Sequence, residues 1–196
     1  MTLQYCDDVS AAAWIVQANI PWTQLVGFGP PDFPAYARLR FIPDPTKPGQ
    51  KEADVNIAYD HPSDMEQTQR ALDHLRSFTA TPEDCYCCVW EGHSDVHFRL
   101  SVLDGPMVTI PNRRYFLFRG SLTDLGSWNE IYEGAAYADL SPAFAWPADH
   151  SWCLAGDVDP HWAGIGAEQA AIDTLLNAPE LDVVPAQPTE PQPTYY

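Results

Sequence analysis

Acidic and histidine side chains recur through one tryptophan-rich stretch, and these residue types can bind a divalent metal or act as general bases. Asp149 and His150 come first, and Asp157, Asp159 and His161 follow a short apolar run. If that run is a strand of a hairpin, the two groups lie at its opposite ends. Asp157, Asp159 and His161 are therefore candidates for the metal site of a hydrolase, and with Asp149 they are candidate partner-binding residues. The alternative is turn chemistry, because aspartates beside a proline bond local backbone N–H groups.

A second group combines cysteines with histidines: Cys85, Cys87, Cys88, His93 and His97. Zinc takes four thiolate or imidazole ligands, and Cys85 and Cys87 would share one face of a strand. The spacing does not match the usual C-x2-4-C pattern, and free cysteine is among the most buried residue types. The sequence favours cysteines buried in the core, with Cys85, Cys87, His93 and His97 as the alternative metal ligands.

Aromatic residues are plentiful, with seven tryptophans in the chain. Trp146, Trp152 and Trp162 stand close together in apolar runs, and we expect them to anchor the core, since large aromatic side chains dominate core energetics. Trp22 and Phe28 belong to a proline-rich stretch that is typical of a loop. These two are the candidates for a surface anchor at a protein interface.

Gly164 and Gly166 precede a helical pattern, and we expect them to form a turn with positive φ. Such a pair at the start of a helix can cradle a phosphate. However, Gln169 stands where a dinucleotide-binding pattern needs glycine, so no nucleotide cofactor is expected.

Arg38 and Arg40 alternate with apolar residues, which predicts a strand with one apolar face. We expect both arginines on the solvated face of the sheet. An anion site is the alternative.

Strands and helices are interleaved without a regular β-α-β rhythm. This pattern predicts an α+β fold with a mostly antiparallel sheet and helices packed against it, as a single domain over 1–184. A flexible proline-rich C-terminal tail is expected over 185–196. Strands are expected at 35–43, 55–59, 85–90, 98–103, 108–110, 114–118, 144–146, 152–155 and 181–184. Helices are expected at 11–16, 63–78, 121–133 and 167–178, with a loop at 19–34.

The charge of the chain is negative and unevenly distributed. The formal net charge is −17, and no lysine or arginine follows Arg119, whereas the last 77 residues carry twelve acidic side chains. A protein that binds nucleic acid directly needs cationic side chains to displace counterions, so this half does not supply such a surface. The charge favours a basic protein partner, or serves solubility alone.

Several features bear on the compartment. No apolar run is long enough to span a membrane. The first residues do not resemble a signal peptide, and the five cysteines are an odd number. We therefore expect a cytoplasmic protein with reduced thiols.

Four segments, ARLRFIPDP, TPEDCYCC, YFLFRGSL and WPADHSWCLAGDVDPHWAGIG, resemble an uncharacterised family of actinobacterial proteins. The resemblance spans about residues 35–184. It implies a cytoplasmic bacterial or phage origin, and it carries over no activity and no functional residue.

These observations favour a non-enzymatic, acidic binding module that docks on a basic protein, as an immunity protein or antitoxin docks on a cationic nuclease. One alternative is a small metal-dependent hydrolase that uses Asp157, Asp159 and His161. Another is a self-associating structural protein. The sequence leaves the oligomeric state open.

Overall fold

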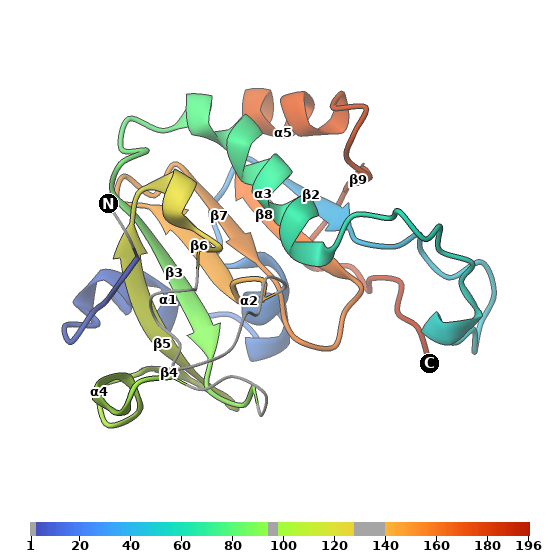
Figure 1. Ribbon diagram of the computed structural model, residues 1–196. Coiled ribbons are helices and arrows are strands. Elements are labelled where there is room, and N and C mark those ends of the chain that lie inside the picture. Colours follow the sequence, from blue (N-terminus) through green and yellow to red (C-terminus); the bar gives the residue numbers. More distant parts are fainter. Residues whose placement is uncertain (1–2, 94–97, 128–139) are drawn as a thin grey trace.

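The computed structural model describes residues 3–93, 98–127 and 140–196. Its fold is α+β, as predicted: a mostly antiparallel sheet with helices packed against it in a single domain (Figure 1). The strands run in the order β1-β5-β3-β6-β7-β8-β2-β9, and β4 pairs with β5. Their bounds are β1 Gln4–Tyr5, β2 Ala35–Arg40, β3 Cys85–Trp90, β4 Val108–Ile110, β5 Arg113–Gly120, β6 Phe144–Pro147, β7 Trp152–Ala155, β8 Trp162–Ala167 and β9 Val183–Pro185.

Helices cover both faces of this sheet. The α-helices are α1 Ala13–Val16, α2 Trp22–Phe28, α3 Asp64–Leu75, α4 Leu100–Leu103 and α5 Gln169–Leu176. Short 3-10 segments lie at Ser10–Ala12, Glu52–Asp54, Arg76–Phe78 and Leu122–Asp124. Figure 1 shows α3 and α5 side by side, and both contribute buried side chains to the core on one face. Residues of α1 and α2 belong to the core on the other face.

Strand β3 separates the two cores. Cys85 and Cys87 are buried with α3 and α5, whereas Cys88 points into the core beneath α1 and α2. Successive side chains of a strand alternate between faces, so a strand covered on both sides reads as an unbroken apolar run. The predicted central strand at 85–90 is therefore confirmed.

The tryptophans predicted to anchor the core are buried. Trp146 and Trp152 are fully buried, and Trp162 is 5% exposed. The hairpin formed by β6 and β7 is also present. It places Trp146 in the core under α1 and Trp152 in the core under α3.

Helix α3 shows how a local signal fixes an element. Ser63 and Glu66 form the predicted capping box: the Ser63 N–H donates to Glu66 Oε2 at 2.9 Å, and the Glu66 N–H donates to Ser63 Oγ at 3.3 Å. This exchange satisfies backbone donors that the first turn of a helix leaves free. Leu72 and Leu75 then bury the apolar face of the helix.

Three predicted elements are wrong. The loop at 19–34 contains α2, which begins after Pro21 and ends at Gly29, where φ is +76°. Proline and glycine here mark the two ends of a helix rather than a loop. The strand at 98–103 is replaced largely by α4, and 55–59 forms no strand. Of the helix expected at 121–133, only a short 3-10 segment lies among the described residues, which stop at 127 on that side.

The glycine turn is also wrong, because Gly164 and Gly166 lie inside β8. A Cβ atom at Gly164 would lie 2.1 Å from the carbonyl oxygen of Gly27 in α2. A Cβ atom at Gly166 would lie 2.5 Å from the ring of Phe33. Glycine is needed in β8 because a helix and an aromatic ring approach the strand closely.

The tail segment, residues 186–196, contains no helix or strand and lies along the domain. The Ala186 N–H donates to the carbonyl oxygen of Tyr36 at 3.0 Å, and the Tyr196 N–H donates to that of Gln50 at 2.9 Å. The predicted boundary at 184 falls inside β9, which ends at Pro185. Flexibility of the tail in solution stays a prediction. No helix among the described residues is long and apolar enough to cross a membrane.

Candidate binding cleft beside the β6–β7 turn

The acidic and histidine residues predicted to act together have separate partners. Asp157 accepts two hydrogen bonds from Arg113, both at 2.9 Å. The side chain of Asp159 is 88% exposed, and its carboxylate lies 4.0 Å from Arg113. His161 Nε2 lies 3.0 Å from a carboxylate oxygen of Asp44. Asp157 and His161 therefore have different partners, and no cluster of three potential metal ligands occurs in residues 3–93, 98–127 and 140–196.

The two predicted surface anchors differ from each other. Phe28 is 3% exposed and packs against Trp162, so its interpretation as a surface anchor is wrong. Trp22 is half-buried, and its ring lies 5.4 Å from the guanidinium of Arg113. The ring of Trp90 also lies 5.4 Å from the guanidinium of Arg113. Trp22 thus helps to hold Arg113, because aromatic faces attract cations.

The cysteines of β3 are poorly suited to metal binding. Burial raises the pKa of the Cys85 thiol to about 12 and the pKa values of Cys87 and Cys88 well above the usual range. Cys85 and Cys87 lie in the core under α3 and α5, whereas Cys88 lies in the core on the other face, so the three thiols do not share one site. His93 lies against the ring of Trp90, and His97 lies outside the described residues.

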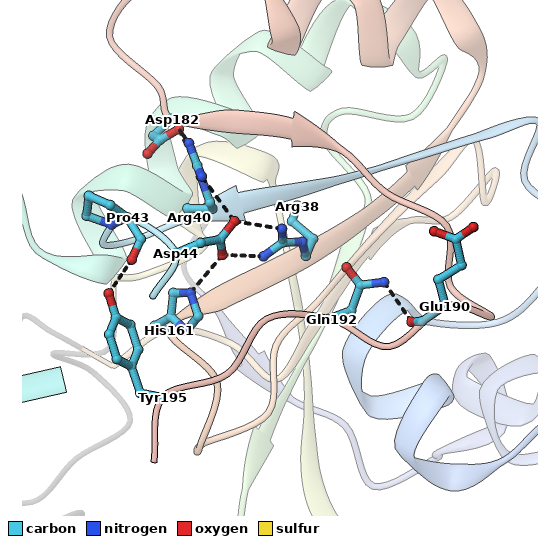
Figure 2. A network of polar contacts seen from close by, with 9 residues as sticks. All are labelled: Arg38, Arg40, Pro43, Asp44, His161, Asp182, Glu190, Gln192 and Tyr195. Atoms are coloured by element: carbon cyan, nitrogen blue, oxygen red, sulfur yellow. Dashed lines mark hydrogen bonds and ion pairs between the residues drawn. The ribbon is translucent and has the colours of Figure 1, made fainter. Parts of the chain in front are cut away.

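The arginines of β2 belong to a polar network, not to a solvated face (Figure 2). Arg38 is 5% exposed and donates two hydrogen bonds to Asp44, at 2.7 and 2.9 Å. Arg40 also contacts Asp44, at 3.0 Å, and pairs with Asp182. Burial opposes ionisation of Asp44, but hydrogen bonds from Arg38 and His161 outweigh it and hold the pKa of Asp44 well below its usual range. This network ties β2 to β8 and to the segment before β9, so the prediction of a solvated face is wrong.

A cleft of about 710 Å³ lies beside the β6–β7 turn. Five separate parts of the chain form its walls: α1, the segment before β2, the segment after α3, the turn itself, and Glu168 just before α5. Its aromatic residues are Trp14, Phe33 and Phe78, and its acidic residues are Asp32 and Glu168. No lysine or arginine is among these lining residues.

Two residues of the cleft adopt a backbone conformation that favours glycine. Asp32 has φ of +82° and His150 has φ of +54°. Such strained residues concentrate at binding and catalytic sites. The imidazole of His150 stacks on Trp14, with ring centroids 4.2 Å apart and an interplanar angle of 12°. Burial lowers the pKa of His150 despite the opposing effect of Asp149, so the ring is neutral near pH 7.

Asp149 holds the turn in place. Its Oδ2 accepts hydrogen bonds from the Ala80 N–H at 2.7 Å and from the Thr79 hydroxyl at 2.9 Å. Its Oδ1 accepts one from the Ser151 N–H at 3.1 Å. Burial raises the pKa of Asp149, but hydrogen bonds from Ser151 and from the chain after α3 outweigh this effect, and the net shift is downward. Asp149, predicted as a binding residue, is therefore a positioning residue for the cleft.

Two polar atoms of the cleft residues have no hydrogen-bond partner in the protein. They are Trp14 Nε1, a donor, and Ser151 Oγ, a donor and an acceptor, and both are buried. Buried polar groups usually have a partner, since leaving one unsatisfied costs about 1–3 kcal/mol. Both atoms are shielded from solvent, so a bound molecule can reach them only if the residues around them move.

Sequence reasoning missed most of these residues. Trp14 was expected only as part of a helix, and Asp32 and Phe33 were placed in a loop. A signal exists in the sequence: Asp32 follows two prolines, and aspartate tolerates the left-handed region better than most residues.

The uneven charge along the sequence is partly neutralised in the fold. Two acidic residues from beyond Arg119 pair with arginines: Asp157 with Arg113 and Asp182 with Arg40. The carboxylate of Glu180 lies 2.6 Å from His74 Nε2. Glu168, in contrast, lies exposed at the cleft. The negative charge of the second half is therefore unevenly compensated. At the cleft, no lysine or arginine among the lining residues compensates it.

No family model matches the chain, and no curated protein or solved structure matches it either. The resemblance to actinobacterial proteins stays a prediction.

Proposed function

We propose that the protein is a non-enzymatic binding module for a basic protein partner, and that the cleft beside the β6–β7 turn receives an arginine or lysine side chain of that partner. One observation carries the proposal: two carboxylates, Asp32 and Glu168, and three aromatic residues line one cleft that has no lysine or arginine among its lining residues.

The chemistry of the cleft supports a cationic ligand. Carboxylates attract a guanidinium or ammonium group, and aromatic faces add about 0.5–1 kcal/mol at exposed sites. The neutral imidazole of His150 does not repel a cation. These features together favour a basic peptide segment over a small inorganic cation.

The net charge of −17 supports the same proposal. Complementary charge speeds the encounter between proteins and loses its effect as salt screens it. Binding of a basic partner should therefore weaken as the salt concentration rises.

Fluorescence anisotropy with labelled basic peptides tests the proposal. A pool of peptides that contain arginine or lysine should bind, and the same peptides with citrulline or norleucine in place of the basic residue should bind at least about tenfold more weakly. The double variant Asp32→Asn, Glu168→Gln should weaken binding by a similar factor. Asparagine is suited to position 32 because it tolerates positive φ.

Asp159→Asn is the matched control. Asp159 is an exposed carboxylate that does not line the cleft, so its removal changes net charge by one unit and leaves the cleft intact. We expect a change of less than about twofold for this variant. If Asp159→Asn weakens binding as much as the double variant of Asp32 and Glu168 does, binding is not assigned correctly to the cleft.

The hydrolase and the self-associating structural protein stay predictions. Metal analysis of the purified protein checks the first, and light scattering checks the second. The immunity-protein or antitoxin role is a particular case of the proposed function, and a cationic nuclease captured at this cleft would support it.

A further inference from the structure

The imidazole of His150 has one covered face and one uncovered face. Its ring stacks on Trp14, with centroids 4.2 Å apart. Among residues 3–93, 98–127 and 140–196, Trp14 is the aromatic residue whose ring contacts it. His150 is nevertheless exposed, and it lines the cleft. The uncovered face is therefore the part of the imidazole that a ligand in the cleft can contact. We define the stacked platform as Trp14 and His150.

The stacked platform is held in place before any ligand binds. The His150 N–H donates to the carbonyl oxygen of Pro147 at 2.9 Å, which closes the β6–β7 turn. Asp149 ties the same turn to the segment after α3. A ring that is held by its own turn and by a tryptophan loses little freedom when a ligand stacks on it, so the platform is preorganised.

A flat aromatic surface suits a guanidinium better than an ammonium group. The guanidinium of arginine is planar and weakly hydrated, so it can stack on a ring while its edge donates hydrogen bonds. The ammonium of lysine is a compact, strongly hydrated charge that gains less from a flat surface. Carboxylates accept two parallel hydrogen bonds from a guanidinium. Asp32 and Glu168 line the cleft together with His150, so both kinds of partner for arginine occur in one cleft.

The charge of the stacked platform depends on pH. Burial lowers the pKa of His150 despite the opposing effect of Asp149, so the ring is neutral near pH 7. The other titratable side chains among the lining residues are Asp32 and Glu168, and the lining residues of α1 and of the segment after α3 include none. In acid the imidazole becomes positive, and it then repels a guanidinium stacked on it.

We infer that the cleft selects an arginine side chain, which stacks on the uncovered face of His150, and that protonation of His150 releases it. The inference rests on the proposed function, because it specifies which basic side chain of the partner the cleft receives and at what pH the cleft holds it.

NMR titrations with N-acetyl-arginine methylamide and N-acetyl-lysine methylamide test the inference. At about pH 7.5 the arginine compound should shift the imidazole signals of His150 and bind at least about fivefold more tightly than the lysine compound. At about pH 5 its binding should be at least about threefold weaker, since an imidazole, and not an ordinary carboxyl group, changes charge over this range.

Two outcomes overturn the inference: equal binding of the two compounds at the higher pH, and an absence of any shift in the His150 signals. The proposed function fails as well only if the basic peptides described above also do not bind.

A second readout needs no variant. If the arginine compound binds the neutral imidazole more tightly than the charged one, linkage requires that the bound compound lower the pKa of His150. We expect the pKa measured by NMR to fall by about 0.5, which corresponds to a threefold preference for the neutral ring. A pKa that is unchanged or raised at saturation contradicts the inference, whatever the affinity.

His150→Asn and His74→Gln provide the matched comparison. Asparagine tolerates the φ of +54° at position 150 and removes both the ring and its titration. His150→Asn should therefore bind the two compounds within about twofold of each other and should lose the pH response. His74 contacts Glu180 and does not line the cleft, so His74→Gln should keep the preference and the pH response of the unaltered protein.

Circular dichroism establishes that both variants are folded. If folded His150→Asn keeps the preference for arginine, another part of the cleft provides it and the stacked platform does not.

Discussion

At the scale of single residues, Asp44 is the centre of a network of polar contacts. Two arginines and a histidine contact its carboxylate, and one of them, Arg38, is almost completely buried. A buried guanidinium is tolerated only when its charge is compensated. Asp44 is therefore the residue on which the stability of the β2–β8 edge depends most.

We expect Asp44→Asn to lower the free energy of unfolding by about 3 kcal/mol near neutral pH, because Arg38 would keep its charge without a partner. The loss should depend on pH. The folded-state pKa of Asp44 lies below the unfolded value of about 4, so its stabilisation is complete above that value and is lost as pH falls through the folded pKa. Urea unfolding between about pH 7 and pH 3 measures the difference in the free energy of unfolding between the unaltered protein and Asp44→Asn. This difference should become smaller in acid.

Asp182→Asn is the control, since Asp182 also pairs with Arg40 but its side chain is 42% exposed. Exposed pairs contribute about 0–1 kcal/mol, so this variant should lose little. The charge-based explanation fails if the difference in the free energy of unfolding between the unaltered protein and Asp44→Asn stays constant down to about pH 3.

At the scale of elements, α2 packs so closely against β8 that residue 164 has no room for a side chain. We expect Gly164→Ala to destabilise the fold by about 3 kcal/mol, because the added methyl group would meet the carbonyl oxygen of Gly27 at 2.1 Å and backbone must move. Thermal unfolding followed by circular dichroism measures the loss, about 6–12 °C for a chain of this size.

Gly156→Ala is the matched control on the connection between β7 and β8. A Cβ atom there would lie 3.4 Å from its nearest neighbour, the Cβ of Ala163, which is an ordinary contact. This variant should change stability by less than about 1 kcal/mol. If both variants unfold at the same temperature, close packing does not explain the glycine at 164.

Elements with local signals could be predicted from the sequence. The capping box of Ser63 and Glu66 specifies where α3 begins, and the unbroken apolar run at 85–90 indicates a strand buried on both faces. Helix α2 was missed because proline and glycine also occur in loops. The packing of Phe28 against Trp162 of β8, which favours the helix, is not visible in the local sequence. Gly164 was misplaced for the same reason, since its role depends on a helix far away in the sequence.

The cleft could not be predicted, because its walls come from parts of the chain with no shared sequence pattern. Trp14, Phe33 and Phe78 each resemble ordinary core residues when taken alone. Only the fold brings them to the turn that carries His150. The sequence did place Asp149 and His150 at that turn, apart from Asp157 and Asp159, and this separation is present in the structure.

At the scale of the whole molecule, two electrostatic effects oppose each other. Local pairs such as Arg113–Asp157 stabilise the fold and are partly buried, so salt screens them weakly. The excess of 17 negative charges repels itself across the whole surface, and salt screens these longer distances strongly. Because the second effect is the more sensitive to salt, it decides the sign of the response.

We therefore expect sodium chloride to stabilise the folded protein. Between about 20 mM and 500 mM, the Debye length falls from about 20 Å to about 4 Å, which removes most repulsion between distant carboxylates and leaves the buried pairs in place. A gain of about 1 kcal/mol corresponds to a rise in melting temperature of about 2–4 °C. Sodium chloride is the suitable salt because sulfate also stabilises proteins by exclusion from their surface. A melting temperature that falls over this range would mean that local ion pairs, and not the net charge, dominate the electrostatics of the fold.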